Sequence, residues 1–504
     1  PKPLAISLYQ ELITDHIWAE NRRLYGYKDL SQFHLMTNFF GTPYIDVRID
    51  FNSWIPKNLD NKISEKVVNF YLKKFKSNVD LHDKVEFEIL FTCFNPSTAK
   101  KINQELFNIL KKNERNKFVN SLKEINKIAL EQQKKDLLLL NELKKRQIKI
   151  EKSNLYFIDK IYWIIEDCKK FGTLPFAGLA RCAFIAMDML NSFVSEKIIT
   201  EEDKIKFLSK INTITSEMES DLSKGKSFFV KKYGHLRPGT YEITSENYRS
   251  RYDLYFGKKK YLKNNKKTQN YKFSSSKKKK IEKFIKKNGI YKNYDQLMSF
   301  IKDSIKNREY AKFIFTKSID QIFSNLNELG KKYKISREDL SFLDIQKILK
   351  LYFDYSNFKS IKSLKTNIRQ NKNEYYKNYL INLPDVINEG KDLFIQKKLE
   401  AKINFISNKI IRSKIINYEY VDLINSLDGI VCIENADPGY DFIFSKNIKG
   451  LVTKYGGQNS HMAIRCAEKN MPALIGVGEK LYNEIVESKF ININCVEKKI
   501  DLIK

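Results

Sequence analysis

Residues 450–477 read GLVTKYGGQNSHMAIRCAEKNMPALIGV, and their pattern predicts a strand, a loop, a helix and a second strand. The apolar run at 450–453 predicts the first strand, and apolar residues at helical spacing over 462–469 predict the helix. The Met-Pro pair at 471–472 ends that helix because proline cannot continue it, and residues 473–477 predict the returning strand. The stretch therefore predicts a strand–loop–helix–strand unit.

His461 lies where the loop of this unit enters the helix, with Ser460 at the N-cap position. Gly456 and Gly457 have no Cβ, so a bulky anion can approach the main chain there. The unpaired N–H groups and the dipole of a helix start stabilise such an anion, and Arg465 on the same helix face is placed to pair with it. An imidazole beside an anion site is typical of covalent phosphoryl transfer. A surface or capping histidine is the alternative.

Residues 453–465, followed by Met-Pro-Ala at 471–473, resemble the phosphohistidine swivelling domain of the phosphoenolpyruvate synthase, pyruvate phosphate dikinase and rifampicin phosphotransferase family. The shared pattern is a Thr, a Gly pair, Ser-His, a small residue, an aliphatic residue and a Pro before a strand. Residues 433–440 match the segment that in this family precedes the strand leading to the histidine. Asn459 departs from the pattern, because the family has Thr or Ala there.

The resemblance implies that His461 is the phosphorylated residue and that Ser460 and Arg465 assist it. It also implies a phosphate-binding loop, which holds Thr453, Gly456 and Gly457.

The chain has 504 residues, with 91 Lys and Arg against 60 Asp and Glu, a formal net charge of +31. The lysines are spread along the whole chain among many asparagines and isoleucines, which is the bias of an AT-rich genome. No nucleic-acid reader motif accompanies them. Solvated lysine faces of long helices explain most of the charge, so specific nucleic-acid binding is disfavoured.

The six cysteines form no CxxC pair and no metal-ligand spacing, which indicates reduced thiols and no metal site in this chain. No apolar run approaches the length of about 18 residues that a transmembrane helix needs, and no signal peptide opens the chain. The sequence therefore predicts a cytoplasmic protein with no membrane partner.

Residues 41–52 read GTPYIDVRIDFN, and their alternating apolar and polar side chains predict a strand with one polar face. That face holds Tyr44, Asp46, Arg48, Asp50 and Asn52. It suits a small zwitterion, with Arg for a carboxylate and Asp for an ammonium group, although an ordinary solvated strand face has the same pattern. The run also resembles the start of the acceptor-binding middle region in relatives of phosphoenolpyruvate synthase, which favours the binding role.

Residues 59–232 have a nearly continuous helical pattern, and the run at 176–186 is its most apolar part. This run contains Arg181. A buried arginine needs an anion partner, so Arg181 is a candidate substrate-binding residue. A structural ion pair, or a side chain that reaches solvent from a helix end, is the alternative.

Residues 233–242, YGHLRPGTYE, interrupt the helical pattern with turn residues. They resemble a YGHRGPGE-type loop in the middle region of the same family. The family has Arg-Gly where this chain has Leu-Arg, so the guanidinium is displaced by one position. Polar residues on a loop between rigid helices are typical of binding sites. His235, Arg237 and Glu242 are therefore the predicted acceptor-site residues.

The expected fold class is α+β, with a large, mostly helical acceptor domain at 1–395 and a small α/β phosphohistidine swivelling domain at 396–504. Within the first domain, residues 258–287 are lysine-rich with little periodicity, which predicts a mobile segment or linker. A helical pattern then resumes, with Ser336 as an N-cap, and continues to about residue 400.

The resemblance implies a relay between two sites. In this family an ATP-grasp domain phosphorylates the histidine, the small domain swings, and the histidine donates its phosphoryl group to an acceptor. No Gly-rich phosphate loop is visible in this chain. We therefore expect an ATP-grasp domain, with its ATP and Mg²⁺, to precede Pro1, and we expect this chain alone not to consume ATP.

The expected acceptor is the amide of L-glutamine. The order of the domains, the IDVRIDFN run and the composition resemble family members that convert ATP, L-glutamine and water to AMP, phosphate and L-glutamine phosphate for capsular phosphoramidate. Asp46, Asp50 and Glu242 are candidates for the base that this weakly nucleophilic amide requires. An antibiotic hydroxyl and pyruvate are the other acceptors, with pyruvate disfavoured because no pyruvate-binding barrel is visible. A non-catalytic nucleic-acid-binding module is the alternative from another class.

Overall fold

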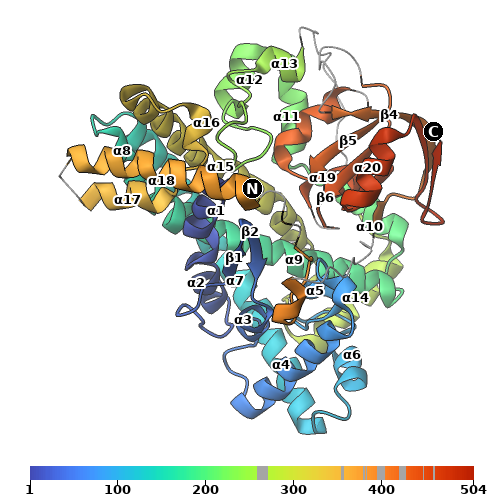
Figure 1. The fold of residues 1–504 in the computed structure, drawn as a ribbon. Coiled ribbons are helices and arrows are strands. Elements are labelled where there is room, and N and C mark those ends of the chain that lie inside the picture. Colours follow the sequence, from blue (N-terminus) through green and yellow to red (C-terminus); the bar gives the residue numbers. More distant parts are fainter. Residues whose placement is uncertain are drawn as a thin grey trace.

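The structure is a computed structural model that describes residues 1–257, 271–353, 357–378, 381, 383–393, 403–418, 427–446, 448–457 and 460–503. A large helical body is followed by an α/β unit that contains the C-terminus (Figure 1). This mixture of helices and sheet agrees with the predicted α+β class. The predicted domain boundary at residues 395–396 lies outside the described residues.

Four helices that pack against one another form the frame of the helical body: α7 (Lys112–Glu151), α8 (Phe157–Cys168), α9 (Leu174–Ser195) and α15 (Tyr294–Tyr333). Helix α9 packs against both α7 and α15, and α8 packs against α15. Together α8, a π-turn and α9 make a helical run from Phe157 to Ser195 that is long and apolar enough to cross a membrane, but 67% of its most apolar window is buried inside the molecule. The run therefore serves here as a core element of the body.

The other helices of the body surround this frame. In the first half they are α1 (Pro3–Tyr9), α2 (Ile17–Leu24), α3 (Val47–Ser53), α4 (Asn61–Lys76), α5 (Val85–Glu88), α6 (Thr98–Glu105), α10 (Glu201–Leu208), α11 (Ile214–Asp221), α12 (Lys226–Tyr233) and α13 (Tyr252–Phe256). In the second half they are α14 (Ser275–Asn288), α16 (Arg337–Leu340), α17 (Ile345–Phe353) and α18 (Asn357–Asn378). A hairpin of β1 (Met36–Phe39) and β2 (Thr42–Ile45) stands apart from the main sheet.

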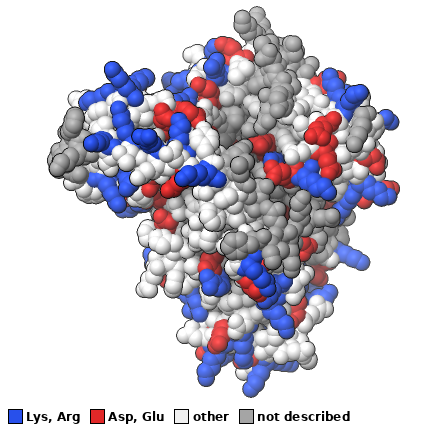
Figure 2. All heavy atoms as spheres, in the orientation of Figure 1, with Lys and Arg blue, Asp and Glu red and all other residues white. Residues whose placement is uncertain are grey.

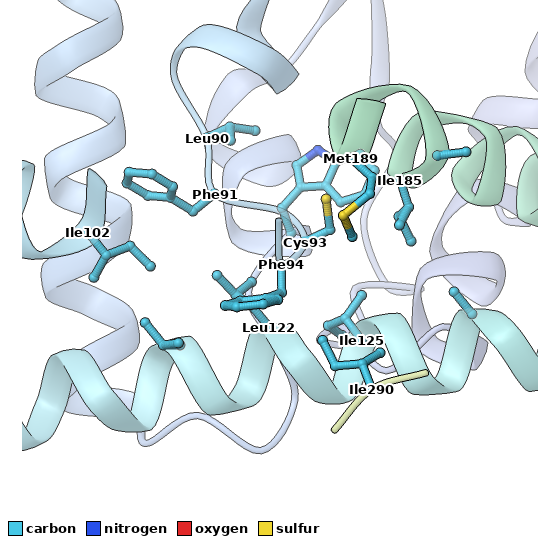
Figure 3. Close-up of a cluster of buried hydrophobic side chains, with 14 of the residues drawn as sticks. Leu90, Phe91, Cys93, Phe94, Ile102, Leu122, Ile125, Ile185, Met189 and Ile290 are labelled. Atoms are coloured by element: carbon cyan, nitrogen blue, oxygen red, sulfur yellow. The ribbon is translucent and has the colours of Figure 1, made fainter. Parts of the chain in front are cut away.

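The largest core joins the N-terminal elements to the frame. Figure 3 shows part of it, in which Leu90, Phe91 and Phe94 come from an extended segment and meet side chains of α6, α7 and α9. Ile102, Leu122 and Ile185 are among these, and all three are fully buried. A second core surrounds α8, α17 and the C-terminal half of α15.

The α/β unit is built on a seven-stranded sheet of order β3-β7-β6-β5-β4-β8-β9. Its strands are β3 (Asn404–Ile406), β4 (Ile410–Asn417), β5 (Ile430–Asn435), β6 (Gly450–Tyr455), β7 (Ala473–Ile475), β8 (Phe490–Asn494) and β9 (Lys499–Ile503). The four strands from β4 to β7 pair in parallel, and β3, β8 and β9 are antiparallel to their neighbours. The helices α19 (His461–Glu468) and α20 (Glu479–Glu487) complete the unit.

The two faces of this sheet have different partners, because successive side chains of a strand point to opposite faces. On β5, Ile430 and Cys432 belong to a core shared with Ile485 of α20. Val431 and Ile433 belong instead to a core that contains residues of α11, α12 and α13. The α/β unit is therefore packed against the helical body through an apolar face as well as through the polar contacts described below.

One prediction about local structure is wrong, and two more are wrong in part. The strand predicted over 44–52 ends at Ile45 and is followed by helix α3. Asp46 caps this helix by accepting a hydrogen bond from the Arg48 backbone N–H (2.9 Å), and Val47 and Phe51 lie one helical turn apart. The polar residues of the run therefore do not share one strand face.

The lysine-rich segment predicted to be mobile includes helix α14, whose Ile281 and Ile285 are buried one turn apart. Residues 258–270 of that prediction lie outside the described residues. The helical pattern expected to reach about residue 400 is interrupted, because residues 383–389 are not helical and Gly390–Leu393 form a 3₁₀ helix. Residues 394–400 of that prediction lie outside the described residues. The predicted N-cap at Ser336 is confirmed, since its side chain accepts from the Asp339 N–H.

Candidate functional site

The strand–loop–helix–strand unit predicted from residues 450–477 is confirmed as β6, α19 and β7. Ser460 is the N-cap of α19, and its hydroxyl accepts a hydrogen bond from the Ala463 N–H at 3.3 Å. His461 is the first residue of the helix. Gly456 has a φ of +134°, and a Cβ there would lie 2.6 Å from the Cβ of Ala436, so the loop requires glycine at this position.

Thr453, predicted to belong to a phosphate-binding loop, is fully buried. Its hydroxyl accepts a hydrogen bond from the Gly476 N–H at 3.0 Å, which ties β6 to the residue that follows β7. Asn459 lies outside the described residues.

The imidazole of His461 is held between two carboxylates from different parts of the chain. Its Nδ1 is 2.6 Å from Oε2 of Glu309 on α15, and its Nε2 is 2.8 Å from Oδ2 of Asp441 on the 3₁₀ segment Pro438–Lys446. The His461 side chain is 6% exposed, and both carboxylates are as deeply buried. The histidine therefore connects the α/β unit to the helical body.

The two carboxylates keep this imidazole protonated. Burial by itself would lower the pKa of His461, but the charges of Asp441 and Glu309 outweigh it and raise the pKa to about 9. Burial by itself would raise the pKa of Glu309, but the adjacent His461 brings it down to about 2. A doubly protonated ring has no lone pair for nucleophilic attack, so in this docked arrangement His461 cannot accept a phosphoryl group.

Arg465 was expected to pair with an anion on His461, but it faces carboxylates instead. Its guanidinium is 2.6 Å from Glu219 of α11 and 2.6 Å from Glu468, and its Nε is 3.5 Å from Asp441. Lys469 also reaches Glu219, at 2.8 Å. The positive face of α19 is therefore docked on acidic side chains of the helical body.

Two further hydrogen bonds add to this docking. The Tyr248 hydroxyl donates to the backbone oxygen of Gly439 at 2.7 Å, and the Thr240 hydroxyl donates to the Asp437 carboxylate at 3.1 Å.

A small pocket of about 40 Å³, partly open to solvent, lies beside His461. Its walls come from α11, from the 233–242 loop, from α15 and from the α/β unit. Residues that line it include Ile214, Thr215, Met218, His235, Arg237, Thr240, Glu309, Lys312, Phe313, Thr316, Asp441 and His461. The structure thus brings His235 and Arg237 to the same pocket as the histidine at the start of α19.

The three residues predicted from the 233–242 loop have different surroundings. Burial lowers the pKa of His235 to about 4, so its ring is neutral, and its Nε2 lies 2.9 Å from the backbone oxygen of Phe313. Arg237 forms a buried ion pair with Asp320. Glu242 accepts hydrogen bonds from the backbone and hydroxyl of Thr244 within its own loop.

The residues predicted from the 44–52 run separate into two groups. Asp46 and Arg48 form an ion pair within α3, and Asn52 donates to the Arg48 backbone oxygen at 2.8 Å. The Tyr44 hydroxyl donates to the backbone oxygen of Pro384. Asp46, Arg48 and Asn52 therefore make local contacts, whereas Tyr44 reaches a distant part of the chain.

Asp50 belongs to a second charged cluster, in which it pairs with Arg22 at 2.8 Å. Arg181 lies in the same cluster, paired with Glu86, so the predicted anion partner of this buried arginine is a carboxylate of the protein itself. The charges of Arg22, Arg181 and Asp50 all act on Glu86.

Among the described residues, no group of three or more His, Cys, Asp or Glu side chains is arranged to hold a metal ion. All six cysteines are buried and free.

Sequence reasoning did not identify Glu309, Asp441 or Glu219 as site residues. Asp441 directly follows the 433–440 motif, and Glu309 lies in a helical pattern with no polar loop around it. Packing of α15 and α11 against the α/β unit brings Glu309 and Glu219 to α19, whereas Asp441 belongs to the α/β unit itself.

No curated protein matches the chain. A family model does match residues 427–498, and these include β5, β6, α19 with His461, β7 and the segment that carries Asp441. This part of the chain matches the mobile domain of PEP-utilising enzymes, which supports a phosphotransferase that works through a phosphohistidine relay.

Proposed function

We propose that this chain is the carrier and acceptor part of a phosphohistidine relay. His461 receives a phosphoryl group that originates from ATP on an ATP-grasp domain outside these 504 residues, and it passes the group to a small acceptor. The observation that carries the proposal is the position of His461, which begins α19 of the matched mobile domain and faces the pocket built by the helical body. ATP and Mg²⁺ would be bound by the ATP-grasp domain, and we place the reaction in the cytoplasm.

The first half of the relay requires His461 to leave Glu309. Asp441 belongs to the same unit as His461, so it travels with the ring and holds one N–H in place. The nitrogen that faced Glu309 then loses its proton to solvent and attacks the phosphoryl group. A P–N bond forms while the P–O bond to the nucleotide breaks, and the electron pair of that bond leaves with the nucleotide oxygen. Undocking of the unit is therefore part of the phosphorylation step.

The second half takes place at the pocket. A hydroxyl or amide of the acceptor attacks phosphorus, the P–N bond breaks, and its electron pair goes to the ring nitrogen. Glu309 takes the proton that the acceptor loses and passes it to this nitrogen. Lys312 lines the same pocket and places positive charge near the transferring group. The product is an imidazolium between Glu309 and Asp441, which is the arrangement of the present structure.

For the acceptor we propose the amide of L-glutamine, as in L-glutamine kinase. The overall reaction would convert ATP, L-glutamine and water to AMP, phosphate and L-glutamine phosphate. Its support is the resemblance of residues 41–52 and the cluster of paired charges around Glu86, which suits a zwitterion.

A second acceptor class has an observation in its favour. The pocket beside His461 is partly apolar, with Ile214, Met218 and Phe313 in its wall. Such a wall favours a hydroxyl carried on an apolar body, such as that of an antibiotic. A nucleic-acid-binding module is less well supported, because on the face shown in Figure 2 the Lys and Arg side chains are dispersed and mixed with Asp and Glu.

The test joins this chain to its ATP-grasp domain and supplies ATP, Mg²⁺ and a panel of acceptors that includes L-glutamine. Phosphorus NMR detects a new P–N species, and mass spectrometry of the peptide with His461 detects the carrier. We expect both signals in the parent protein and neither in His461→Asn. The matched control is His82→Asn, which changes an exposed histidine and should leave both signals intact. Turnover in His461→Asn would refute the relay.

A further inference from the structure

Arg181 of α9 occupies a buried, largely aromatic site. Its side chain is 3% exposed, and its guanidinium lies 4.7 Å from the ring centroid of Trp54 and 4.7 Å from that of Phe184. Nη2 donates to the Thr92 hydroxyl at 2.8 Å. The buried Nε has no hydrogen-bond partner among the described residues. The guanidinium is therefore fixed in position but only partly satisfied.

The anion that faces Arg181 is less firmly held than Arg181 itself. Glu86 supplies it from α5, a helix of four residues none of which is buried. The Glu86 side chain is 31% exposed, in contrast to the arginine. The site thus combines a rigid cationic receptor with a carboxylate that can move out toward solvent.

Further charges of both signs surround this carboxylate. Arg22 stacks over the same Trp54 ring at 3.6 Å and pairs with Asp50, and Asp188 accepts a hydrogen bond from Asn95 at 2.6 Å. The charges of Arg22, Asp50 and Asp188 all act on Glu86. If the Glu86 carboxylate moves away, the cations Arg181 and Arg22 can bind the carboxylate of an amino acid. The anions Asp50 and Asp188 can bind its ammonium group.

We propose that Arg181 binds the carboxylate of an amino-acid ligand and that Glu86 is the internal occupant of this site, displaced when the ligand binds. The binding site at Arg181 follows from the geometry alone. The statement that its ligand is also the phosphoryl acceptor rests on the proposed function.

Displacement of Glu86 has a direct route to the carrier. The segment that leads into α5 lies against the loop before His461, since a Cβ on Gly457 would be 3.8 Å from the backbone oxygen of Asp83. Ligand binding at Arg181 therefore moves a segment that contacts the histidine loop.

The test is isothermal titration of the 504-residue chain with three compounds. L-Glutamine carries both charged groups, glutaramate lacks the ammonium group, and 4-aminobutanamide lacks the carboxylate. We expect the first two to bind and the third not to bind. Glu86→Gln removes the internal competitor, and if the site is open about a tenth of the time, L-glutamine binds about tenfold more tightly to this variant. Glu88→Gln, on the exposed side of the same helix, should leave the affinity unchanged.

Arg181→Gln should abolish binding of L-glutamine, and if this variant does not fold, Glu86→Gln decides the question. Equal binding of 4-aminobutanamide and L-glutamine would overturn the inference, as would an unchanged affinity in Glu86→Gln or no binding by any carboxylate of an amino-acid panel. If another amino acid binds with the same dependence on Glu86, the proposed site is supported, and only the proposal that L-glutamine is the acceptor is refuted. Phosphorylation of His461 is measured separately by mass spectrometry, so failure of the relay can be distinguished from failure of the ligand site at Arg181.

Discussion

Replacement of Glu309 by Gln tests whether a carboxylate of the helical body keeps His461 protonated and docked. The change preserves the size of the side chain and removes one of the two charges that face the imidazole. The ring of His461 then keeps only Asp441 as a charged partner. We expect its pKa to fall and the docked state to be lost at lower pH.

The magnitude follows from the pKa of His461, which rises from 6.5 to about 9. At about 1.36 kcal/mol per pKa unit, this corresponds to about 3 kcal/mol in favour of the protonated ring. Because burial lowers the pKa of His461, the two carboxylates together contribute more than this net amount. If they contribute equally, removal of Glu309 costs more than about 1.5 kcal/mol and lowers the pKa by more than about one unit.

The sign of the pH dependence differs for the two partners. The pKa of His461 is raised in the docked state, so its contribution is complete below 6.5 and is lost as the pH rises through about 9. The pKa of Glu309 is lowered from 4.5 to about 2, so its contribution is complete above 4.5 and is lost as the pH falls through about 2. Docking through this pair should be strongest between pH 4.5 and 6.5.

The assay is an NMR titration of the histidine ring protons, with the His461 signal identified by its loss in His461→Asn. The parent protein should show a midpoint near 9 for His461, and Glu309→Gln a midpoint lower by more than about one unit. Glu328→Gln, at an exposed position of the same helix, is the matched control and should keep the parent midpoint. A parent midpoint near 6.5, or a midpoint that Glu309→Gln does not move, would refute this account of the site.

Three further changes test other parts of the structure. Gly456→Ala places a Cβ 2.6 Å from that of Ala436 at a φ of +134°, so thermal unfolding of the α/β unit should show a loss of about 1–3 kcal/mol; an unchanged Tm would contradict the strain. Arg237→Ala leaves Asp320 buried and unpaired, which should lower the free energy of unfolding in denaturant by about 3–5 kcal/mol; a loss below about 1 kcal/mol would show that the pair is not buried. Tyr248→Phe removes the hydroxyl that donates to Gly439 and should weaken docking of the α/β unit by about 0.5–1.5 kcal/mol, seen as faster limited proteolysis; equal proteolysis would argue against this contact.

The sequence predicted the β6–α19–β7 unit well because its signals act over a few residues. Ser460 caps the helix that follows it directly, Gly456 allows a loop conformation that other residues rarely adopt, and Pro472 prevents the helix from continuing. Such effects depend on the backbone of the same segment, so they can be recognised without knowledge of the rest of the chain.

The run 44–52 shows why local patterns can also mislead. Its alternation fits a strand, but Val47 and Phe51 are also one helical turn apart, and Asp46 is a good N-cap. The Asp46 cap and the packing of Phe51 against the core favour a helix over most of the run 44–52. Burial of Ile281 and Ile285 likewise favoured a helix in a segment whose lysine content had indicated a mobile linker.

The sequence by itself determined where a histidine stands at the start of a helix in an α/β unit, and through the 427–498 match it determined the kind of domain that carries it. Only the tertiary structure decided what that histidine contacts. Glu309 lies far from His461 in the sequence, and Arg465 contacts Glu219 of α11 as well as nearby carboxylates. Electrostatic attraction depends on distance and burial, so any of the 60 acidic residues is a possible partner until packing brings a few of them close.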